Sequence, residues 1–251
     1  MRTWEGLDAM LEVRAVTAGY GSLDVVHDFS MRLDEGEIAC IVGPNGSGKS
    51  TILKTVVGII KPRRGRIVLD GEDITGLEPH VALKKGICML PQGRTAFPMM
   101  TVSENLQMGA YILKDRGQIQ ERFRQAYDLF PVLAARQTDL AHKLSGGELA
   151  MLCIARALMS DPKIMLLDEP SLGLAPKVTD FLYQKIAEIN RGGSSLLIVE
   201  QSVRRALNAA RYAYVLTLGR KRFEGRPEEL LTDDRLRSLY VGTHEDEPHK
   251  I

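Results

Sequence analysis

Short apolar runs recur along the chain, and turn-forming residues separate them. Several of these runs are apolar at consecutive positions, which is typical of strands that are covered on both faces. The pattern predicts strands over residues 10–18, 37–43, 66–71, 86–92, 163–170 and 194–201, and a hairpin over 211–225. We therefore expect an α/β core.

Between the strands at 86–92 and 163–170 the apolar spacing changes to that of amphipathic helices. Thr101 and Glu104 form a capping-box sequence, which predicts a helix from there to about Leu113. Two further helices are predicted over 118–130 and 148–160. This stretch is expected to be a helical lobe that is inserted into the α/β core.

These elements predict one domain over residues 1–251, and no internal repeat divides the chain. The expected divisions are a core over 10–92 and 163–240, a helical lobe over 93–162, and tails over 1–9 and 243–251.

The segment GPNGSGKS, residues 43–50, matches the phosphate-binding pattern G-x-x-x-x-G-K-[ST] between a buried strand and an amphipathic helix. Its glycines, Gly43, Gly46 and Gly48, let backbone N–H groups turn toward phosphate oxygens at a helix N-terminus. Lys49 can reach the β- and γ-phosphates, and Ser50 can bind Mg²⁺. The alternative, a glycine-rich structural turn, is disfavoured because the whole pattern matches in its required setting.

An apolar strand ends in Asp168 and Glu169, which supplies the acidic groups that nucleotide hydrolysis needs. Asp168 can hold Mg²⁺ through water, and Glu169 can polarise an attacking water. Adjacent acids at a strand end are also common as solvated charges. The phosphate-binding loop makes the catalytic interpretation the stronger one.

Ser145, Gly146 and Gly147 bury little apolar surface, yet they stand directly before a strong helical run. We expect the first turn of that helix to offer unpaired N–H groups and a positive dipole end, which together make a second anion site. A second site is useful if it closes over a γ-phosphate from another direction. The alternative is an N-capping serine followed by flexible glycines.

Composition adds few constraints. The chain has 33 basic and 32 acidic residues and a net charge of +1, so no overall field points to nucleic acid or anionic lipid. The basic stretch 61–66 is short, which favours a solvated loop over a nucleic-acid patch. Cys40, Cys88 and Cys153 lie in apolar runs and are expected to be buried thiols in a reducing compartment. Neither a signal peptide nor an apolar run long enough to span a bilayer is recognisable.

Taken together, these segments resemble the ATP-binding subunits of ABC transporters over essentially the whole chain. The matching positions are residues 43–50, 144–148 (LSGGE), 164–170 (IMLLDEP), Gln92 and Tyr20. The resemblance implies an α/β P-loop NTPase fold of the ABC type, with a RecA-like mixed sheet, an antiparallel β region and the inserted helical lobe. It also implies ATP and Mg²⁺ as cofactors.

In that family two such domains pair head to tail, and each ATP lies between the phosphate-binding loop of one and the LSGG segment of the other. The resemblance implies that Tyr20 stacks on adenine, that Gln92 contacts Mg²⁺ and the attacking water, and that Glu169 is the general base. Ser50 and Asp168 would complete the Mg²⁺ site. The implied nucleotide contacts are Gly43, Pro44, Asn45, Gly46, Ser47, Gly48, Lys49, Ser50, Thr51, Ser145, Gly146, Gly147 and Glu148, with Ser145 and Gly147 gripping the γ-phosphate of the other subunit. As local patterns, Tyr20 could be an ordinary turn aromatic and Gln92 the start of a loop.

Two positions depart from the wider family. Gln201 stands where histidine is usual, and Leu149 follows the LSGGE segment where glutamine is usual. Gln201 can still hydrogen-bond a γ-phosphate, although it cannot carry a positive charge. Because Glu169 is intact, we expect hydrolysis to persist.

The segments GEDITGLEPH, PQGRTAFPMMTVSENL, DEPSLGLAPK and IVEQS look like those of ATPases from branched-chain amino acid importers, a group that includes urea and short-amide importers. This resemblance implies a cytoplasmic location on the inner face of the membrane. The implied partners are a second ATPase subunit, identical or different, two permease subunits and, indirectly, a solute-binding protein, with no nucleic acid.

Residues 93–101 expose Phe97, Met99 and Met100 in the sequence-based interpretation and could contact a permease helix; packing under the inserted helices is the alternative. Two other function classes remain in competition. A soluble ABC-type ATPase acting on DNA or ribosomes would usually need a coiled-coil insertion or a duplicated domain. A P-loop phosphotransferase would leave LSGGE and Glu169 without a role.

Overall fold

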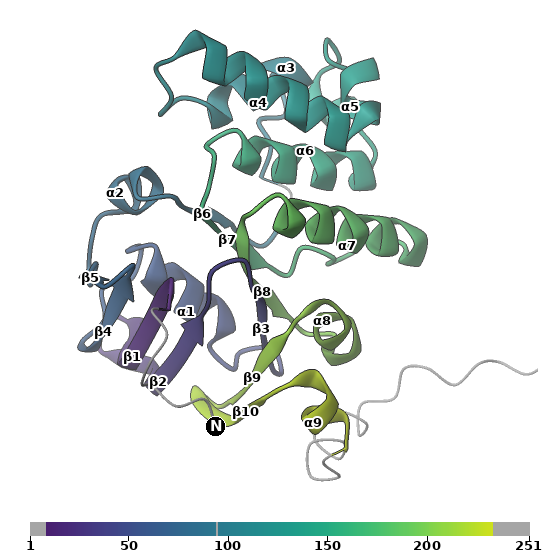
Figure 1. Cartoon of the computed structure of the whole chain (residues 1–251). Coiled ribbons are helices and arrows are strands. Elements are labelled where there is room, and N and C mark those ends of the chain that lie inside the picture. The colour runs from purple at the N-terminus through teal and green to yellow at the C-terminus, as the bar shows by residue number, and fades with distance from the viewer. Residues whose placement is uncertain (1–8, 94, 233–251) are drawn as a thin grey trace, which may run out of the picture.

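The computed structural model describes residues 9–93 and 95–232 of the chain (Figure 1). The predicted tails lie outside these residues, except for Ala9, which is buried. The described chain forms two sheets and a group of helices that Figure 1 shows as a stack above the six-stranded sheet.

The smaller sheet is antiparallel. In spatial order it contains β2 (Leu23–Leu33), β1 (Leu11–Tyr20), β4 (Arg64–Leu69) and β5 (Glu72–Asp73). This is the expected antiparallel β region.

The larger sheet is mixed. In spatial order it contains β10 (Arg220–Gly225), β9 (Tyr212–Thr217), β3 (Ile38–Val42), β8 (Ser195–Glu200), β7 (Ile164–Asp168) and β6 (Ile87–Leu90). Only the β9–β10 pair is antiparallel within it. The carboxyl ends of β3, β8, β7 and β6 therefore lie at one edge of the sheet, which is where open α/β sheets place their ligands.

The helices fall into two groups. Four of them, α3 (Val102–Gly109), α4 (Arg116–Leu129), α5 (Pro131–Ala135) and α6 (Gly146–Leu158), together with the short 3₁₀ helix Ala141–Lys143, lie between β6 and β7 in the chain. The others are α1 (Lys49–Val56), α2 (Pro79–Lys84), α7 (Pro176–Arg191), α8 (Val203–Ala209) and α9 (Pro227–Thr232). None of the helices in the described part of the chain combines the length and apolar character that a bilayer crossing requires.

The large sheet separates two hydrophobic cores, and its consecutive apolar residues divide between them. In β3, Ala39 and Ile41 pack with α1 and the small sheet, whereas Cys40 and Val42 pack with α6, α7 and α8 on the other face. Strand side chains alternate between faces, so a strand covered on both sides must be apolar throughout. The continuous runs in the sequence are explained by this arrangement.

The predicted strands and hairpin are all present, but β2 is a strand that the pattern did not reveal. Its pairing with β1 is interrupted by register shifts between Val13 and Gly19. Ala15 and Asp28 have positive φ angles of 50° and 51° on the paired strands. Irregular pairing of this kind breaks the alternation on which strand prediction depends. The basic stretch 61–66 is also only partly a loop, since β4 begins at residue 64.

The predicted helices are present with shifted ends. The capping box at Thr101 and Glu104 opens α3, but this helix ends at Gly109 rather than near Leu113. The helix predicted over 148–160 begins two residues earlier, at Gly146, and ends at Leu158. Of the three thiols, Cys40 and Cys153 are buried as expected and Cys88 is only partly buried.

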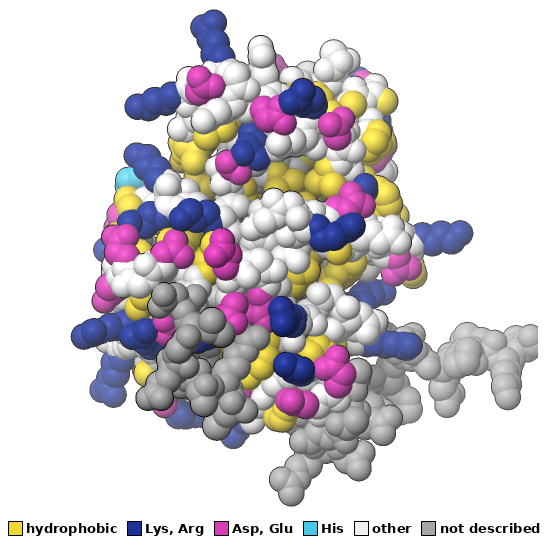
Figure 2. Space-filling view, viewed as in Figure 1, with side chains coloured by type: hydrophobic (Ala, Val, Ile, Leu, Met, Phe, Trp, Pro, Cys, Tyr) yellow, Lys and Arg dark blue, Asp and Glu magenta, His cyan; other side chains and the backbone are white. Residues whose placement is uncertain are grey.

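Figure 2 shows Lys and Arg side chains mixed with Asp and Glu across the visible face, and a band of apolar side chains between α4 and α6. The two signs of charge are interspersed on this face, in keeping with the small net charge.

Candidate functional site

The phosphate-binding loop connects buried β3 to α1. Gly46 and Gly48 have φ angles of 75° and 101°, a region that side chains other than glycine rarely adopt. A Cβ at Gly43 would lie 2.2 Å from the carbonyl oxygen of Leu216, so no larger residue fits there. Gly48 is the N-cap of α1, and it supplies no side-chain cap for that helix. The N-terminus of α1 is thus left for a ligand to complete.

Lys49 is the cation of this loop, and only 4% of it is exposed. Its Nζ donates hydrogen bonds to the carbonyl oxygens of Gly43 (2.8 Å) and Pro44 (3.1 Å), and it lies 3.8 Å from Glu169 Oε1. Burial lowers the pKa of Lys49, and the neighbouring carboxylates, Glu169 first, oppose that change. The ammonium is thus held beside the loop, where it can meet the charge of an incoming phosphate.

Ser47 adds a second indication of a ligand. Its hydroxyl is buried and has no hydrogen-bond partner among the described residues. Buried polar groups in proteins are almost always hydrogen-bonded, and an exception calls for an explanation. A phosphate oxygen in the cradle formed by residues 43–50 would supply the missing partner, so the loop fits a nucleotide phosphate.

Asp168 ends β7 beside the phosphate-binding loop. Ser50 Oγ donates a hydrogen bond to Asp168 Oδ1 at 2.9 Å. Burial raises the pKa of Asp168, and the hydrogen bond from Ser50 and two nearby lysines oppose the rise. The structure therefore brings together two oxygen ligands of the kind that Mg²⁺ prefers.

Glu169, the next residue, is held in an unusual conformation. Its φ angle is 49°, and its N–H donates to the carbonyl oxygen of Val199 at 2.9 Å. Gln92 Nε2 donates to Glu169 Oε2 at 3.0 Å. Burial raises the pKa of Glu169, with further increases from the charges of Asp168 and Glu200, while Lys49 opposes them. Left-handed backbone at a residue other than glycine costs energy and is often found at functional sites.

The residues here suit a magnesium nucleotide better than a metal ion held by protein alone. Among residues 9–93 and 95–232, no three His, Cys, Asp or Glu side chains converge as a metal cage. Mg²⁺ commonly binds through one or two protein oxygens, several waters and substrate phosphates. Ser50, Asp168 and the side-chain oxygen of Gln92 fit that pattern.

Tyr20 and Gln201 flank this centre without a direct contact to Glu169. Tyr20 ends β1 and is half exposed, and Lys54 of α1 lies over its ring, with Nζ 5.9 Å from the centroid. Gln201 directly follows β8, which lies between β3 and β7 in the sheet. Gln201 is exposed at the edge from which both Asp168 and the phosphate-binding loop emerge.

The segment 145–148 lies closer to helix α6 than the sequence predicted, because most of it is part of the helix. Gly146 and Gly147 form the first turn of α6 rather than preceding it, and Ser145 is the N-cap. The first turn is also not fully unpaired, because Ser145 Oγ accepts the Glu148 N–H and Glu148 Oε2 accepts the Ser145 N–H. No hydrogen bond or ion pair between described residues joins 145–148 to 43–50.

Two structural features of this segment were not predicted from the sequence. Arg136 donates to Glu148 Oε2 at 2.8 Å and so supports the capping box. A Cβ on Gly147 would lie 2.7 Å from Val178 Cγ1 of α7, so the glycine allows α6 and α7 to approach. Neither signal is visible in a single sequence, because the partners lie 12 and 31 positions away along the chain.

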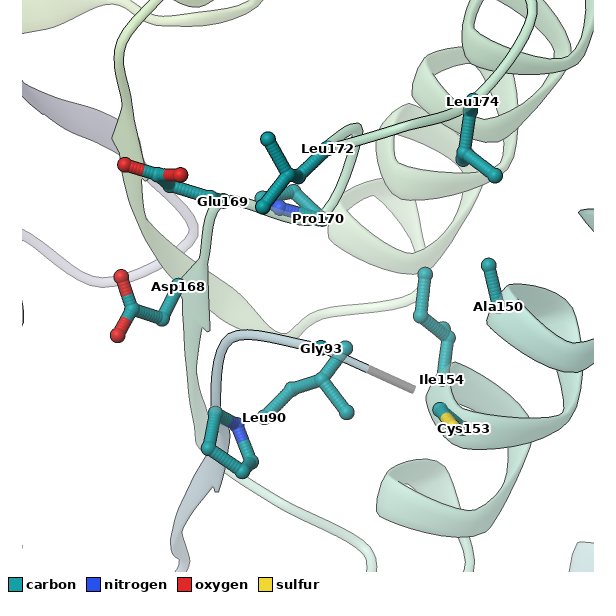
Figure 3. A pocket seen from close by; sticks show the side chains of 11 residues that line it. Leu90, Gly93, Ala150, Cys153, Ile154, Asp168, Glu169, Pro170, Leu172 and Leu174 are labelled. Atoms are coloured by element: carbon teal, nitrogen blue, oxygen red, sulfur yellow. The ribbon is translucent and has the colours of Figure 1, made fainter. Parts of the chain in front are cut away.

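A cavity of about 280 Å³ lies between α6 and the carboxyl ends of β6 and β7. Figure 3 shows Ala150, Cys153 and Ile154 of α6 on one side of it and Asp168 and Glu169 on the other, with both carboxylates pointing away from α6. Leu172 and Leu174 extend from the segment after Glu169. The edge of the sheet that carries Asp168 and Glu169 is thus separated from α6 by a cavity with a mainly apolar lining.

Comparison with known proteins agrees with this geometry. The sequence pattern that describes the ABC transporter family matches residues 26–172. The chain belongs to the ABC transporter family. It is an ATPase of the type that family defines, with a P-loop NTPase fold of the ABC class.

Relatives of this ABC transporter ATPase include branched-chain amino acid and lipopolysaccharide systems. The high-affinity branched-chain amino acid transport ATP-binding protein BraG of Pseudomonas aeruginosa is 40% identical, over 93% of this chain and 100% of BraG. The lipopolysaccharide export system ATP-binding protein LptB of Haemophilus influenzae is 35% identical, over 93% of this chain and 98% of LptB. The solved ADP conformation of an ATP-binding cassette of an ABC transporter has a TM-score of 0.85 and 28% identity, and covers 94% of this chain and 99% of its own.

Proposed function

We propose that this ABC transporter ATPase works as one half of a head-to-tail pair. In the pair, each ATP lies between residues 43–50 of one subunit and residues 145–148 of the other. One observation carries the proposal: the phosphate-binding loop is joined to Asp168 and Glu169 within the chain, while the signature segment makes no hydrogen bond or ion pair with that loop among the described residues. A second subunit gives the exposed Ser145 a phosphate to bind.

Within one half, each residue receives a role from its contacts. Ser50, Asp168 and Gln92 would hold Mg²⁺, which would supply positive charge to offset the negative charge of the phosphates. Glu169 is the general base that accepts a proton from water, and burial raises its pKa, which strengthens it as a base. Gln92 donates to the Glu169 carboxylate at 3.0 Å and so orients it.

Gln201 contributes a hydrogen bond to the γ-phosphate rather than a proton. Its amide can donate and accept but does not titrate. Turnover therefore persists in the wild-type protein, because the base is Glu169. The purified wild-type protein with its partners should hydrolyse ATP; normal activity in Gln201→His beside an inactive wild type would reject this role.

The transported solute is a branched-chain or related amino acid, moved inward at the cytoplasmic membrane. The similarity to BraG over almost the whole chain supports this choice. The chain acts with a second ATPase subunit, two permeases and a solute-binding protein. Urea or short amides are an alternative within the same machinery, and the similarity to LptB makes lipopolysaccharide export a second candidate.

Residues 93–101 supply the contact with the permease. They belong to the helical lobe formed by residues 93–162. Phe97 is 42% exposed and Met99 is 74% exposed. Met100 is partly buried, so it offers less surface to a permease than the sequence predicted. Fully buried Asn105 anchors the segment, because its side chain accepts the Phe97 N–H at 2.8 Å and donates to the Phe97 carbonyl at 3.0 Å. Arg156 lies over the Phe97 ring at 5.1 Å. A rigid base with an apolar tip suits docking to a helix groove.

The pairing is tested by sedimentation of Glu169→Gln with saturating MgATP, alone and with its cognate companions. We expect an ATP-dependent dimer, because binding persists while hydrolysis stops. A strictly monomeric protein in both conditions would reject the paired site.

The transport assignment is tested in proteoliposomes that contain the cognate permeases. Phe97→Glu should abolish solute uptake and leave basal ATP hydrolysis unchanged, while Tyr111→Glu, a matched change at another exposed aromatic, should keep uptake. Uptake of leucine against urea separates the importer alternatives. ATPase stimulation only by lipopolysaccharide-exporting permeases would favour the second candidate.

A further inference from the structure

The buried carboxylate of Glu200 has no part in the roles described above. Only 3% of Glu200 is exposed, and it is the last residue of β8. Its Oε1 accepts hydrogen bonds from Ser171 Oγ at 2.7 Å, from the Ser171 N–H at 3.4 Å, and from the Tyr183 hydroxyl at 2.9 Å. One oxygen atom thus connects β8, the segment after β7 and helix α7.

Ser171 belongs to the turn that begins at Glu169. The Leu172 N–H donates to the Glu169 carbonyl at 3.1 Å, and the Leu174 N–H donates to the Ser171 carbonyl at 3.2 Å. Strand β8 therefore holds the turn at two residues. The Glu169 N–H donates to the Val199 carbonyl oxygen, and the Ser171 hydroxyl donates to the Glu200 carboxylate. Both restraints surround the left-handed backbone of Glu169, a conformation that persists only where neighbouring contacts impose it.

Glu200 also lies near the buried cation of the phosphate-binding loop, Lys49. Three carboxylates stabilise the charged form of Lys49, in the order Glu169, Asp168 and Glu200. They oppose the lowering of the Lys49 pKa by burial. Glu200 is therefore close enough to the site to influence it.

We propose that Glu200 is a positioning residue for ATP hydrolysis, which through Ser171 and Tyr183 holds the turn that aims Glu169 at its water. This proposal rests on the role of Glu169 as general base proposed above. Glu200 does not touch the nucleotide in this scheme, so its loss should slow the chemical step and leave ATP binding nearly intact. A displacement of about 1 Å at a reacting group can cost on the order of 10²-fold in rate.

The test compares variants of Glu200 in the full-length protein by steady-state ATPase kinetics. Glu200→Ala removes the tether and should lower kcat by about 10- to 100-fold, with KM for ATP within about threefold of wild type. Glu200→Gln keeps the acceptor oxygen and should retain kcat within about threefold. Rescue by the amide, confined to kcat, supports positioning by hydrogen bonds. Wild-type kcat in Glu200→Ala, or equal damage in Glu200→Gln, overturns the proposal.

Smaller changes protect the test against misfolding of Glu200→Ala. Ser171→Ala and Tyr183→Phe each delete one donor to the same oxygen, and each should lower kcat less than Glu200→Ala does. Asp180→Asn is the matched control: it removes an exposed charge from α7, the helix that contains Tyr183, and it should leave kcat unchanged. Wild-type kcat in both single-donor variants overturns the proposal.

Glu169→Gln separates this proposal from the one beneath it. If Glu169→Gln still hydrolyses ATP, the assignment of the general base is wrong. If Glu169→Gln is inactive while all Glu200, Ser171 and Tyr183 variants turn over normally, only the positioning role is wrong.

Discussion

The N-termini of α1 and α6 are the two candidate phosphate sites, and they are built in opposite ways. The first turn of α1 has a glycine N-cap with positive φ and no side-chain cap, and buried Lys49 lies within it. The first turn of α6 closes itself, since Ser145 and Glu148 hydrogen-bond to each other's N–H groups and Arg136 supports Glu148.

The difference shows how much each site depends on its ligand. An uncapped helix end beside a buried ammonium and an unpaired Ser47 hydroxyl is completed by a phosphate. A capped helix end is already stable, so in the proposed pair a phosphate from the other subunit would add to contacts that already exist. The α1 site should therefore dominate affinity, and the α6 site should control whether two subunits close.

The largest expected effect is at the α1 site. Lys49→Ala should lower ATP hydrolysis by at least about 10²- to 10³-fold, because it removes the cation aimed at the terminal phosphates. Steady-state ATPase assays measure the change. Lys61→Ala, at an exposed lysine outside the loop, is the control and should match wild type. Wild-type turnover in Lys49→Ala would mean that nucleotide binds elsewhere.

A change of charge at the α6 N-cap should come next. Ser145→Asp and Ser145→Asn both keep a side-chain oxygen that can cap α6, but only Asp repels phosphate. We expect thermal stability close to wild type in both variants, with hydrolysis reduced about 10²-fold in Ser145→Asp and much less in Ser145→Asn. Thermal unfolding and ATPase assays make the comparison. Equal ATPase activity in the two variants would contradict phosphate binding at the N-terminus of α6.

Packing under the α6 site gives a smaller effect. Gly147→Ala should destabilise the protein by about 1–3 kcal/mol, since its Cβ would lie 2.7 Å from Val178. The double variant Gly147→Ala, Val178→Ala frees the space and should regain most of that stability in chemical denaturation. Stability that returns without hydrolysis would show that Gly147 is needed for the nucleotide as well as for packing.

The smallest effect is expected from pH. Hydrogen bonds from the backbone and hydroxyl of Thr101 lower the pKa of Glu104 in the capping box of α3. A carboxyl with a lower pKa when folded contributes stability above its unfolded value of about 4.3, and that stability is lost as the pH falls through the folded value. Glu104→Gln should therefore show a shallower loss of melting temperature in acid than wild type.

Glu148 gives the matching measurement at α6. Burial acts to raise its pKa, but hydrogen bonds from Ser145 and Arg136 outweigh burial, and the pKa is lowered. Glu148→Gln should flatten the acid dependence in the same direction as Glu104→Gln. A change in ATPase activity is expected only for Glu148→Gln, because α3 contributes no residue to the candidate site. Loss of hydrolysis in both variants would trace the effect to general instability.

Some parts of this protein could be read directly from short stretches of sequence. The phosphate-binding loop, the capping box of α3 and the buried strands each depend on residues that are neighbours in the chain. Strand β2 could not be read in this way, because the irregular pairing around Ala15 and Asp28 disrupts its alternation. The start of α6 was misplaced because glycines are poor helix formers, and here packing against Val178 favours one inside the helix.

The sequence by itself determined the family, the phosphate-binding loop and the positions of the acidic and signature residues, because local pattern is sufficient for these. Only the tertiary structure decided which of them meet. Ser50 and Asp168 are 118 residues apart, and Gln92 and Glu169 are 77 apart, so their contacts depend on the order of strands in the sheet. The buried link from Glu200 to Ser171 and Tyr183 belongs to the same class, since hydrogen bonds between distant elements leave no periodic trace in the chain.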